Sequence, residues 1–432
     1  MEYATDMSFR HVCSIFLRRI LDPDSESIGH TLKEAFPKER NARLKIHPGL
    51  EGGPIYLDYN ATTPIDPVVV EAMLPYLSEQ FGNPSSSHHY GRITYQAIDA
   101  ARAQVAQLLG CNAKAITFTG GGSESDNLAI RGIALAYQEK GNHIITQITE
   151  HPAVLRTCLA LERLHGFRVT YLPVDGSGRV SIEEVEAAID NKTVLITIMH
   201  ANNETGTVQP IAEIAKIARK HGVLLHTDAA QSVGKIPVRV EELGVDLLTV
   251  AGHKLYAPKG IGALYSRPDL NLEPVIYGGG QESGRRAGTE SVAHIVALGT
   301  ACLLTQEHLS ETQVRLCSMR DNLQRLIEQC APGHVHLNGH ITERLPNTLN
   351  ISVDRVNGEE VLAITPEIAS STGAACHEGS TDPSSVLMAM GFSRERALGA
   401  MRLTLGRWST EEEIERAARL LAKSIDSLRR KQ

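Results

Sequence analysis

Residues 223–231 read VLLHTDAAQ and residues 246–254 read DLLTVAGHK, and these two stretches decide the fold. Each is a short apolar run that ends in polar residues, with Asp228 at the end of the first and Lys254 just past the second. Similar apolar runs alternate with longer helical patterns from Ile55 onward. Continuous apolar strands separated by helices predict a mostly parallel sheet covered on both faces. We therefore expect an α/β protein.

The expected secondary structure places both polar groups at one edge of that sheet. Strands are expected at residues 115–119, 143–148, 168–172, 194–199, 223–226, 246–250 and 262–265. Helices are expected at residues 123–139, 153–165, 182–189 and 211–221. Because ligands of such sheets bind at the carboxyl ends of the strands, Asp228 and Lys254 fall where a ligand would lie.

Asp228 and Lys254 are the pair that an enzyme needs to hold pyridoxal phosphate. The carboxylate keeps the pyridine nitrogen protonated, and the lysine forms a Schiff base with the aldehyde. Each residue also has a simpler interpretation, because Asp228 could cap a helix and Lys254 could be a surface lysine like Lys259. The apolar run before Asp228 would bury its charge, which then requires a cationic partner. The glycine-rich turn around Lys254 favours it over Lys259.

The length of the chain limits the number of domains, and its charge limits the kinds of partner. At 432 residues, two domains are expected: a large cofactor-binding domain at 66–310 and a smaller α+β domain made of 54–65 and 311–432. The smaller domain would contain the second part of a long helix expected at about 291–329. It would also contain short strands near 349–353 and a final helix from Thr410. The net charge of −7 gives no basic surface for nucleic acid. No apolar stretch approaches the roughly 20 residues that span a bilayer.

Residues 1–53 are expected to form an N-terminal extension outside both domains. They carry eight Lys/Arg and eight Asp/Glu, whereas targeting segments are poor in acidic residues. This composition favours a cytoplasmic protein. If the extension is a targeting segment, a mitochondrial location is the alternative.

The seven cysteines are scattered, odd in number and without a C-x-x-C pair. This pattern argues against a disulfide framework or a zinc site and favours a reducing compartment. Cys376 differs from the others because it lies in STGAACHEGS, residues 371–380. Small neighbours leave its thiol accessible, and His377 could lower its pKa. An inert buried cysteine is the alternative, and it fits poorly with so many small residues.

Two further segments follow expected strands. TGGGSES, residues 119–125, combines glycines with a helix start, so Gly122 and Ser123 suit a phosphate. A tight turn with a helix cap at Ser123 is the alternative. In TEH, residues 149–151, the His151 imidazole could stack on a cofactor ring or shuttle protons. A histidine in a surface loop is the commoner case.

Amide and guanidinium groups supply candidates for substrate binding. Asn203, within NNETG at 202–206, could hold a phenolate oxygen or a carboxylate, although Asn and Gly also favour turns. Arg402 and Arg407, in MRLTLGR at 401–407, suit bidentate capture of an α-carboxylate. A salt bridge on an edge strand is the alternative for either arginine.

Together these residues resemble the pyridoxal-phosphate cysteine desulfurases and the related selenocysteine lyases, which share the aspartate aminotransferase fold (fold type I) and are class V aminotransferase-like. The resemblance runs from about Ile55 to the C-terminus. It is carried by LDYNATTP, GNPSSSH, TEH, NNETG, HTDAAQ, GHK, GGGQE, RRAGTE, LPNTLN, the cysteine loop and MRLTLGR.

The resemblance implies a role for each matched residue. Lys254 would be the Schiff-base lysine and the base that removes the substrate Cα proton, and Asp228 would pair with the pyridinium nitrogen. The other implied roles are His151 stacked on the ring and assisting proton transfer, Gln231 on the ring oxygen, Asn203 on the ring oxygen or the substrate carboxylate, Arg402 on that carboxylate, Gly122, Ser123 and His253 on the phosphate, Thr289 on the phosphate of the partner subunit in a homodimer, and Cys376 as the nucleophile.

The implied activity converts L-cysteine to L-alanine and leaves the sulfur on Cys376 as a persulfide. An acceptor protein would then take the sulfur, for iron–sulfur assembly or another thiolated product. A selenocysteine lyase acting on L-selenocysteine is the alternative, because His377 departs from the small residues of many desulfurases and Ala251 stands where many relatives have serine. An aminotransferase or desulfhydrase, or an inactive scaffold partner, is also open.

Overall fold

The computed structural model describes residues 46–373 and 382–430. The chain divides into two units, Met1–Pro48 and Gly49–Gln432. Only residues 46–48 of the first unit are described, so the fold below is that of the second unit. The predicted nucleophile Cys376 and its neighbour His377 lie outside the described residues.

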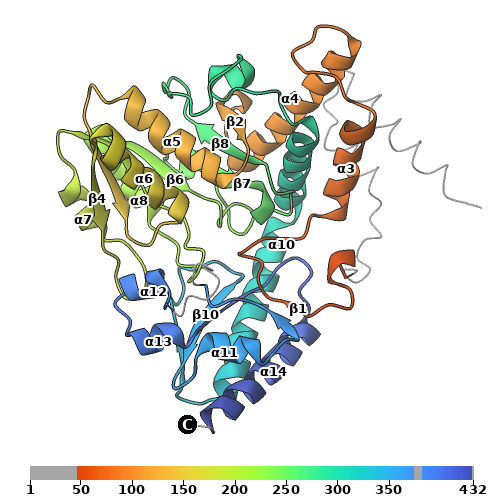
Figure 1. Ribbon diagram of the computed structural model, residues 1–432, viewed down its shortest axis with the longest axis vertical. Helices are drawn as coiled ribbons and strands as arrows, with labels where there is room; N and C mark the ends of the chain where they lie inside the picture. The colour runs from red at the N-terminus through yellow and green to blue at the C-terminus, as the bar shows by residue number, and fades with distance from the viewer. Residues whose placement is uncertain (1–45, 374–381, 431–432) are drawn as a thin grey trace, which may run out of the picture. The chain divides into compact units, whose positions relative to one another are not determined.

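A seven-stranded sheet lies at the centre of the larger hydrophobic core (Figure 1). Its strand order is β2-β8-β7-β6-β5-β3-β4, and β7, β6, β5, β3 and β4 run parallel while β8 is antiparallel to both neighbours. The strands are β2 (Ile116–Thr119), β3 (His143–Gln147), β4 (Arg168–Leu172), β5 (Thr193–Thr197), β6 (Leu224–Asp228), β7 (Leu247–Ala251) and β8 (Gly262–Ser266). The predicted mostly parallel sheet is confirmed, and every predicted strand is present to within a few residues.

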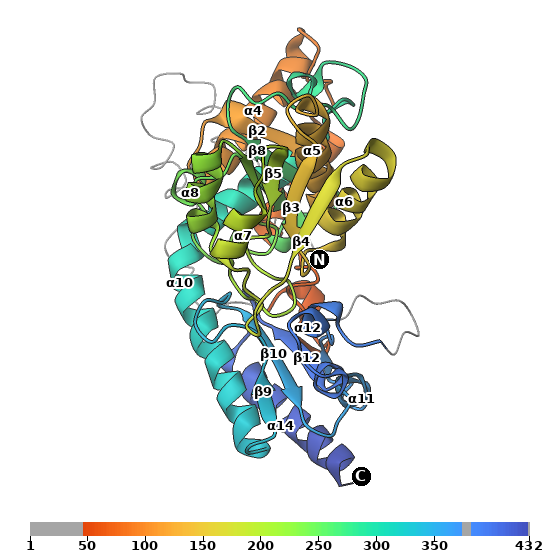
Figure 2. The same ribbon diagram turned by 90° about the vertical axis from the view of Figure 1, so that its left-hand side faces the viewer.

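Helices cover both faces of this sheet, as continuous apolar strands require. One face packs on α5 (Gly122–Ala136) and α6 (Pro152–His165). The other face packs mainly on α4 (His89–Leu109), α8 (Ile211–His221) and the first part of α10 (Val292–Cys330) (Figure 2). Further elements are α3 (Pro67–Ser78), α7 (Ile182–Ala188), α9 (Val240–Leu243), and the 3-10 turns η2 (Pro48–Leu50), η3 (Ala113–Ala115), η4 (Gly252–Lys254) and η5 (Gln281–Gly284).

A second core surrounds the three-stranded sheet β12-β10-β9. The second half of α10 packs on this sheet together with α14, so α10 takes part in both cores (Figure 2). The elements are β1 (Ile55–Tyr56), β9 (Val335–Leu337), β10 (Thr348–Val353), β11 (Ile368–Ala369), β12 (Ala400–Thr404), α11 (Gly358–Ala363), α12 (Ser385–Ala389), α13 (Arg394–Leu398) and α14 (Glu411–Arg429). The domain boundaries expected from the sequence remain a prediction.

Local sequence patterns did not predict α3 and α4, two long helices that precede the sheet. α3 has the sequence PVVVEAMLPYLS, with three consecutive valines and an internal proline, Pro75. These residues form helices poorly by themselves. Its buried residues Val69 and Met73 belong to the larger core, and α3 packs against α10. Tertiary packing therefore decides this helix rather than local preference.

Candidate active site

The carboxyl ends of β6 and β7 bring Asp228 and Lys254 to one edge of the sheet. Asp228 is the last residue of β6, is 7% exposed, and its Oδ1 accepts a hydrogen bond of 2.9 Å from the Ala230 N–H. The next helix, α9, starts only at Val240, so the helix-cap interpretation of Asp228 is wrong. Burial raises the pKa of Asp228, whereas Ala230, His151 and Lys254 oppose this rise.

Lys254 ends η4 and is partly buried beside that carboxylate. Its Nζ donates to the carbonyl oxygen of Ala61 at 2.8 Å and to the carbonyl oxygen of Asn60. Burial and the Arg402 cation lower its pKa to about 8, while Asp58 and Asp228 act in the opposite direction. A substantial fraction of this amine is therefore uncharged near neutral pH, as a nucleophile or a base requires.

The start of α5 adjoins the turn that carries Lys254. A Cβ placed on Gly122 would lie 3.2 Å from the Cβ of Ala251, three residues before Lys254. The helix cap is Gly121, at φ 146°, and it makes no side-chain capping hydrogen bond. Ser123 therefore lies within the first turn and is exposed, so the alternative interpretation, a helix cap at Ser123, is wrong. In the part of the chain that the structure describes, no atom beyond the adjacent residues lies within 4 Å of a Cβ built on Gly121, so the helix start is open to a ligand.

Two histidines flank Lys254. The His151 Nδ1 accepts a hydrogen bond of 3.2 Å from the Ala153 N–H at the start of α6, and its side chain is exposed to solvent. The surrounding protein lowers its pKa by desolvation, with Asp228 opposing and Lys254 adding to the effect. The His253 Nδ1 lies 3.2 Å from Thr62 Oγ1, and burial and nearby cations lower its pKa to about 4. Both rings are therefore neutral at pH 7.

Asn60 joins several of the predicted residues, although the sequence analysis gave it no role. Its carbonyl oxygen accepts from Lys254 Nζ and, at 2.9 Å, from Gln231 Nε2. Its side-chain Nδ2 donates to the carbonyl oxygen of Asn203 at 3.2 Å. Lys235, also without a predicted role, donates to Asn60 Oδ1 at 2.8 Å. The only available signal was the position of Asn60 inside the LDYNATTP motif.

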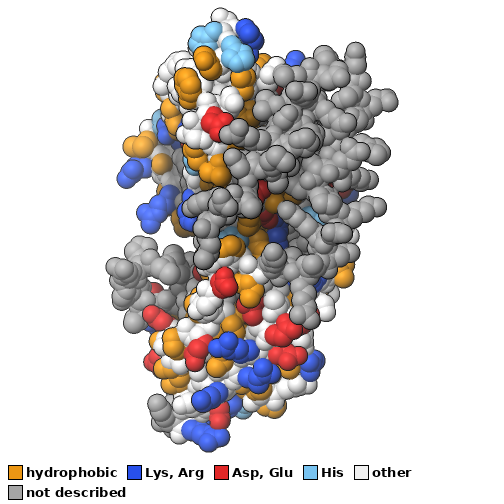
Figure 3. Space-filling model, turned by 90° about the vertical axis from the view of Figure 1, so that its right-hand side faces the viewer, with side chains coloured by type: hydrophobic (Ala, Val, Ile, Leu, Met, Phe, Trp, Pro, Cys, Tyr) orange, Lys and Arg blue, Asp and Glu red, His pale blue; other side chains and the backbone are white. Residues whose placement is uncertain are grey.

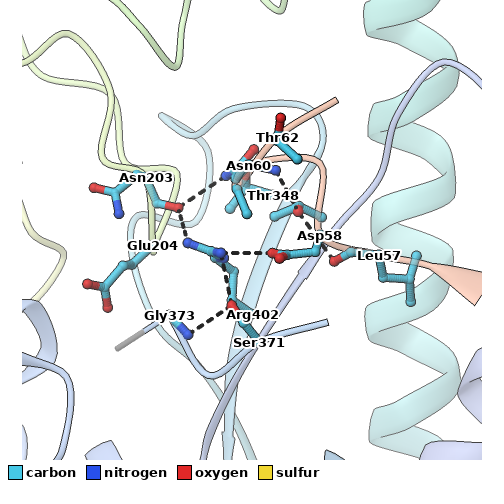
Figure 4. Close-up of polar contacts among 12 residues, drawn as sticks. Leu57, Asp58, Asn60, Thr62, Asn203, Glu204, Thr348, Ser371, Gly373 and Arg402 are labelled. Carbon is cyan, nitrogen blue, oxygen red and sulfur yellow. Dashed lines mark hydrogen bonds and ion pairs between the residues drawn. The ribbon is translucent and has the colours of Figure 1, made fainter. Parts of the chain in front are cut away.

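Arg402 lies on β12 and reaches the same place from the smaller sheet. Its Nη2 donates to Asp58 Oδ1 at 2.8 Å and to Ser371 Oγ at 2.9 Å, and its Nη1 donates to the Asn203 carbonyl oxygen at 3.2 Å. The buried Nε has no partner among the described residues. Figure 4 shows the Asn203 side chain pointing away from Arg402 while its carbonyl oxygen points toward it.

Arg407, the second arginine of that segment, is placed elsewhere. It pairs with Asp66, and its guanidinium lies 4.2 Å from the ring centroid of Tyr256. Arg407 therefore forms a salt bridge but lies beyond β12, whereas Arg402, on the edge strand β12, forms its salt bridge with Asp58. Thr289 lies in an exposed loop before α10. Among the residues next to the segment that holds Cys376, Ser384 donates to Glu204 Oε2 at 2.5 Å, and Gly373 lies beside the same carboxyl group.

Comparison with known proteins identifies the family of the chain. The profile of the Aminotransferase class-V family matches residues 55–417. The chain belongs to this family. It is 48% identical over 377 residues to the cysteine desulfurase IscS of Dictyoglomus turgidum, covering 87% of this chain and 95% of that protein. It is 47% identical to the cysteine desulfurase IscS of Methanosarcina thermophila, covering 88% of this chain and 94% of that protein.

Solved structures of the family have the same fold. A NifS-like protein, 36% identical, matches with a TM-score of 0.80 over 87% of this chain and 99% of its own. The protein SspA, solved in complex with cysteine and 41% identical, matches with a TM-score of 0.73 over 82% of this chain and all of its own. The fold type I architecture expected from the sequence is thus confirmed. No helix of the described residues is long and apolar enough to cross a membrane.

Pyridoxal phosphate is the cofactor of this family, and the residues present fit it. The buried Asp228 carboxylate suits a pyridinium nitrogen, and the partly uncharged Lys254 amine suits an aldehyde. The open glycine start of α5, a 15-residue helix, suits a phosphate because its first N–H groups have no partners within the helix. The Nε2 of Gln231 has one N–H beyond the bond to Asn60 and could reach a ring oxygen.

Proposed function

We propose that this chain is a pyridoxal-phosphate-dependent cysteine desulfurase that makes L-alanine from L-cysteine. One observation carries the proposal: a buried carboxylate and a lysine of lowered pKa lie at neighbouring strand ends, beside the open start of α5. The 47–48% identity to cysteine desulfurases over most of the chain, and the cysteine-bound relative, support cysteine as the substrate.

Lys254 has two tasks in this proposal. It would hold the cofactor covalently, and after the substrate amine replaces it, the freed Nζ would remove the proton from the substrate Cα. When bound, the cofactor supplies an electron sink that makes this proton acidic. The carbonyl oxygens of Asn60 and Ala61, which accept from Nζ in this structure, are suited to hold the freed amine. His151 would face the cofactor ring, and Asp228 would hold the proton on the ring nitrogen.

Arg402 would bind the substrate carboxylate. Its guanidinium already contacts one carboxylate, that of Asp58, and its buried Nε has no partner within residues 46–373 and 382–430. A substrate carboxylate could bind through this free donor and replace part of the Asp58 contact. Such bidentate contacts fix the substrate in a single orientation.

Cys376 would take the sulfur. The thiolate attacks the substrate sulfur, an S–S bond forms, and the substrate Cβ–S bond breaks. Cβ gains a proton and becomes the methyl group of alanine, while the sulfur remains on Cys376 as a persulfide. Sulfur is oxidised and carbon is reduced within this step, so no external oxidant is required. A sulfur-acceptor protein would remove the persulfide sulfur.

We also propose a homodimer. Apolar side chains gather on and between α3 and α4, and Figure 3 shows hydrophobic side chains at the surface over these helices. They are 36–76% exposed and comprise Val70, Leu74, Leu77, Phe81, Tyr90 and Tyr95. Large exposed apolar patches mark interaction surfaces. The exposed loop with Thr289 would then be free to reach the phosphate of the partner subunit.

The cytoplasm remains the proposed compartment. All five cysteines that the structure describes are free thiols: Cys111, Cys158, Cys302, Cys317 and Cys330. Free thiols are typical of a reducing compartment.

The test treats the purified enzyme with L-cysteine and, in parallel, with L-selenocysteine. We expect alanine from cysteine and a mass increase of one sulfur atom on the peptide that contains Cys376. Cys376→Ala should lose alanine formation from cysteine. A turnover ratio overwhelmingly in favour of selenocysteine, without persulfide, would replace the proposal with a selenocysteine lyase. Free sulfide without persulfide would replace it with a desulfhydrase.

A further inference from the structure

Lys235 is a second buried lysine beside the site, and the proposed mechanism does not use it. It is 9% exposed and lies four residues after Gln231. Its Nζ donates to Gln231 Oε1 at 2.6 Å and to Asn60 Oδ1 at 2.8 Å. Both acceptors are uncharged side-chain carbonyl groups. Burying a lysine costs free energy, and here the two amide contacts offset part of that cost.

The orientation of the Asn60 amide is decided by its other contacts. Its Nδ2 donates to the Asn203 carbonyl oxygen at 3.2 Å and to Thr348 Oγ1 at 2.9 Å. A backbone carbonyl can only accept, so the NH2 group must face Asn203 and Oδ1 must face Lys235. Lys235 is therefore the donor in this contact. Figure 4 shows Asn60 between Asn203 and Thr348.

The orientation of the Gln231 amide follows in the same way. Its Nε2 donates to the Asn60 carbonyl oxygen at 2.9 Å, and its Oε1 accepts from Lys235. Lys254 Nζ donates to the same carbonyl oxygen of Asn60. The NH2 group of Gln231 and the Lys254 amine therefore lie side by side, and Lys235 holds the opposite end of the carboxamide.

We propose that Lys235 is a positioning residue of the cofactor site, which holds the Gln231 carboxamide with its NH2 group turned toward Lys254. In this arrangement one N–H of Gln231 remains available for the ring oxygen of the cofactor. The inference rests on the proposed function, because that function assigns the ring-oxygen contact to Gln231.

The charge state of Lys235 agrees with this role. Burial, Lys254 and Arg402 hold its pKa well below the ordinary value for lysine. Lys254 and His308 line the same cavity as Lys235, and the nearby Asp58 carboxylate pairs with Arg402. An uncharged amine has two N–H groups, and the two recorded contacts use both. The lowered pKa favours this uncharged form, for which the two contacts satisfy both N–H groups.

The test is a double-mutant cycle on the holoenzyme with Lys235→Met, Gln231→Leu and the double variant. The readout is the pH midpoint of the visible absorbance change as the cofactor bound to Lys254 titrates. A donor to the ring oxygen stabilises its anionic form, so its loss raises this midpoint by about half to one pH unit. We expect Lys235→Met and Gln231→Leu to raise it equally, and the double variant to raise it no further.

The exposed Lys259 provides the matched control, and Lys259→Met should leave the midpoint unchanged. An unchanged midpoint in Lys235→Met, or shifts that add in the double variant, would overturn the inference. Should Lys235→Met fail to fold, Lys235→Gln retains a shorter donor and should raise the midpoint by a smaller amount, and no rise would count against the inference.

A second measurement needs no cofactor and so separates this inference from the proposed function. The free energy of unfolding of the apoprotein is compared with that of apo Lys235→Met as a function of pH. Burial lowers the pKa of Lys235 in the folded chain, so the unfolded chain binds more protons below about pH 10.4, and the wild type should gain stability relative to the variant as the pH rises toward that value. A difference that does not change with pH would contradict a lowered pKa of Lys235. A wild type without any visible band would contradict the proposed function and, with it, the ring-oxygen contact of Gln231, whereas the unfolding measurement would still test the lowered pKa of Lys235.

Discussion

The two sheets contribute differently to the site. The seven-stranded sheet supplies the cofactor half, with Asp228 and Lys254, and the three-stranded sheet supplies the substrate half, with Arg402. At the end of the seven-stranded sheet, the side chains of Asp228 and Lys254 hydrogen-bond, among the described residues, only to backbone groups. At the edge of the three-stranded sheet, Arg402 already contacts the carboxylate of Asp58 and the hydroxyl of Ser371. The cofactor half is therefore open and built from the backbone. The substrate half is already paired with a carboxylate of the chain itself, which a substrate must partly replace.

The largest effect is expected when the Lys254 amine is removed from the cofactor half. Lys254→Ala removes both the covalent anchor and the proton-transfer group, so kcat should fall by about 10³-fold or more. The measurement is the initial rate of alanine release from L-cysteine. Lys259→Met is the control and should retain the full rate, and a Lys254→Ala enzyme within tenfold of the wild type would contradict the role of Lys254.

The substrate half is tested by changing the shape of its cation while keeping the charge. Arg402→Lys loses the planar fork, and each lost charge-assisted hydrogen bond contributes about 1.5–3 kcal/mol. We expect kcat/KM for L-cysteine to fall by roughly tenfold to a hundredfold. Arg407→Lys, five residues on, changes a residue that pairs with Asp66 and should have little effect. Equal losses in the two variants would show that the effect on Arg402 is structural.

The open amine also predicts a pH dependence for cofactor uptake. Only the uncharged amine attacks an aldehyde, and the pKa of Lys254 is lowered to about 8. The rate at which apoprotein forms the visible absorbance band with pyridoxal phosphate should rise about tenfold per pH unit below pH 8 and level off above it. A rate that still rises beyond pH 10 would indicate an ordinary, solvent-exposed lysine.

Asp58 connects the two halves, and its removal should give the smallest effect. Its carboxylate pairs with Arg402 and raises the pKa of Lys254. Asp58→Asn should therefore shift the pH midpoint of cofactor uptake below 8, by less than about one unit, because the side chain is partly exposed. The same kinetic measurement checks this shift, and a midpoint that moves upward would show that Asp58 does not act through its charge.

Local sequence patterns were sufficient to place Asp228 and Lys254 at one edge of the sheet. Asp228 and Lys254 each follow an apolar strand, and the parallel sheet brings such strand ends together without further information. The start of α5 was found for the same reason. The glycine at position 121, rather than Ser123, caps the helix because its φ of 146° is disfavoured for residues with a Cβ.

The contacts between distant segments could not be predicted in this way. Asn60 and Lys235 are 175 residues apart, and Arg402 and Asp58 are 344 apart. No local pattern contains such a pair, because the contact exists only after the segment before α3 has folded against both sheets. The Asp58 partner of Arg402 and the Lys235 partner of Gln231 are therefore findings of the structure alone.

The account depends most on the covalent attachment of the cofactor to a single amine. Borohydride reduction of the purified holoenzyme, followed by peptide mapping, locates this amine directly. The label should lie on Lys254 and on no other residue. A label on Lys235 or Lys259, or on no lysine, would contradict the account.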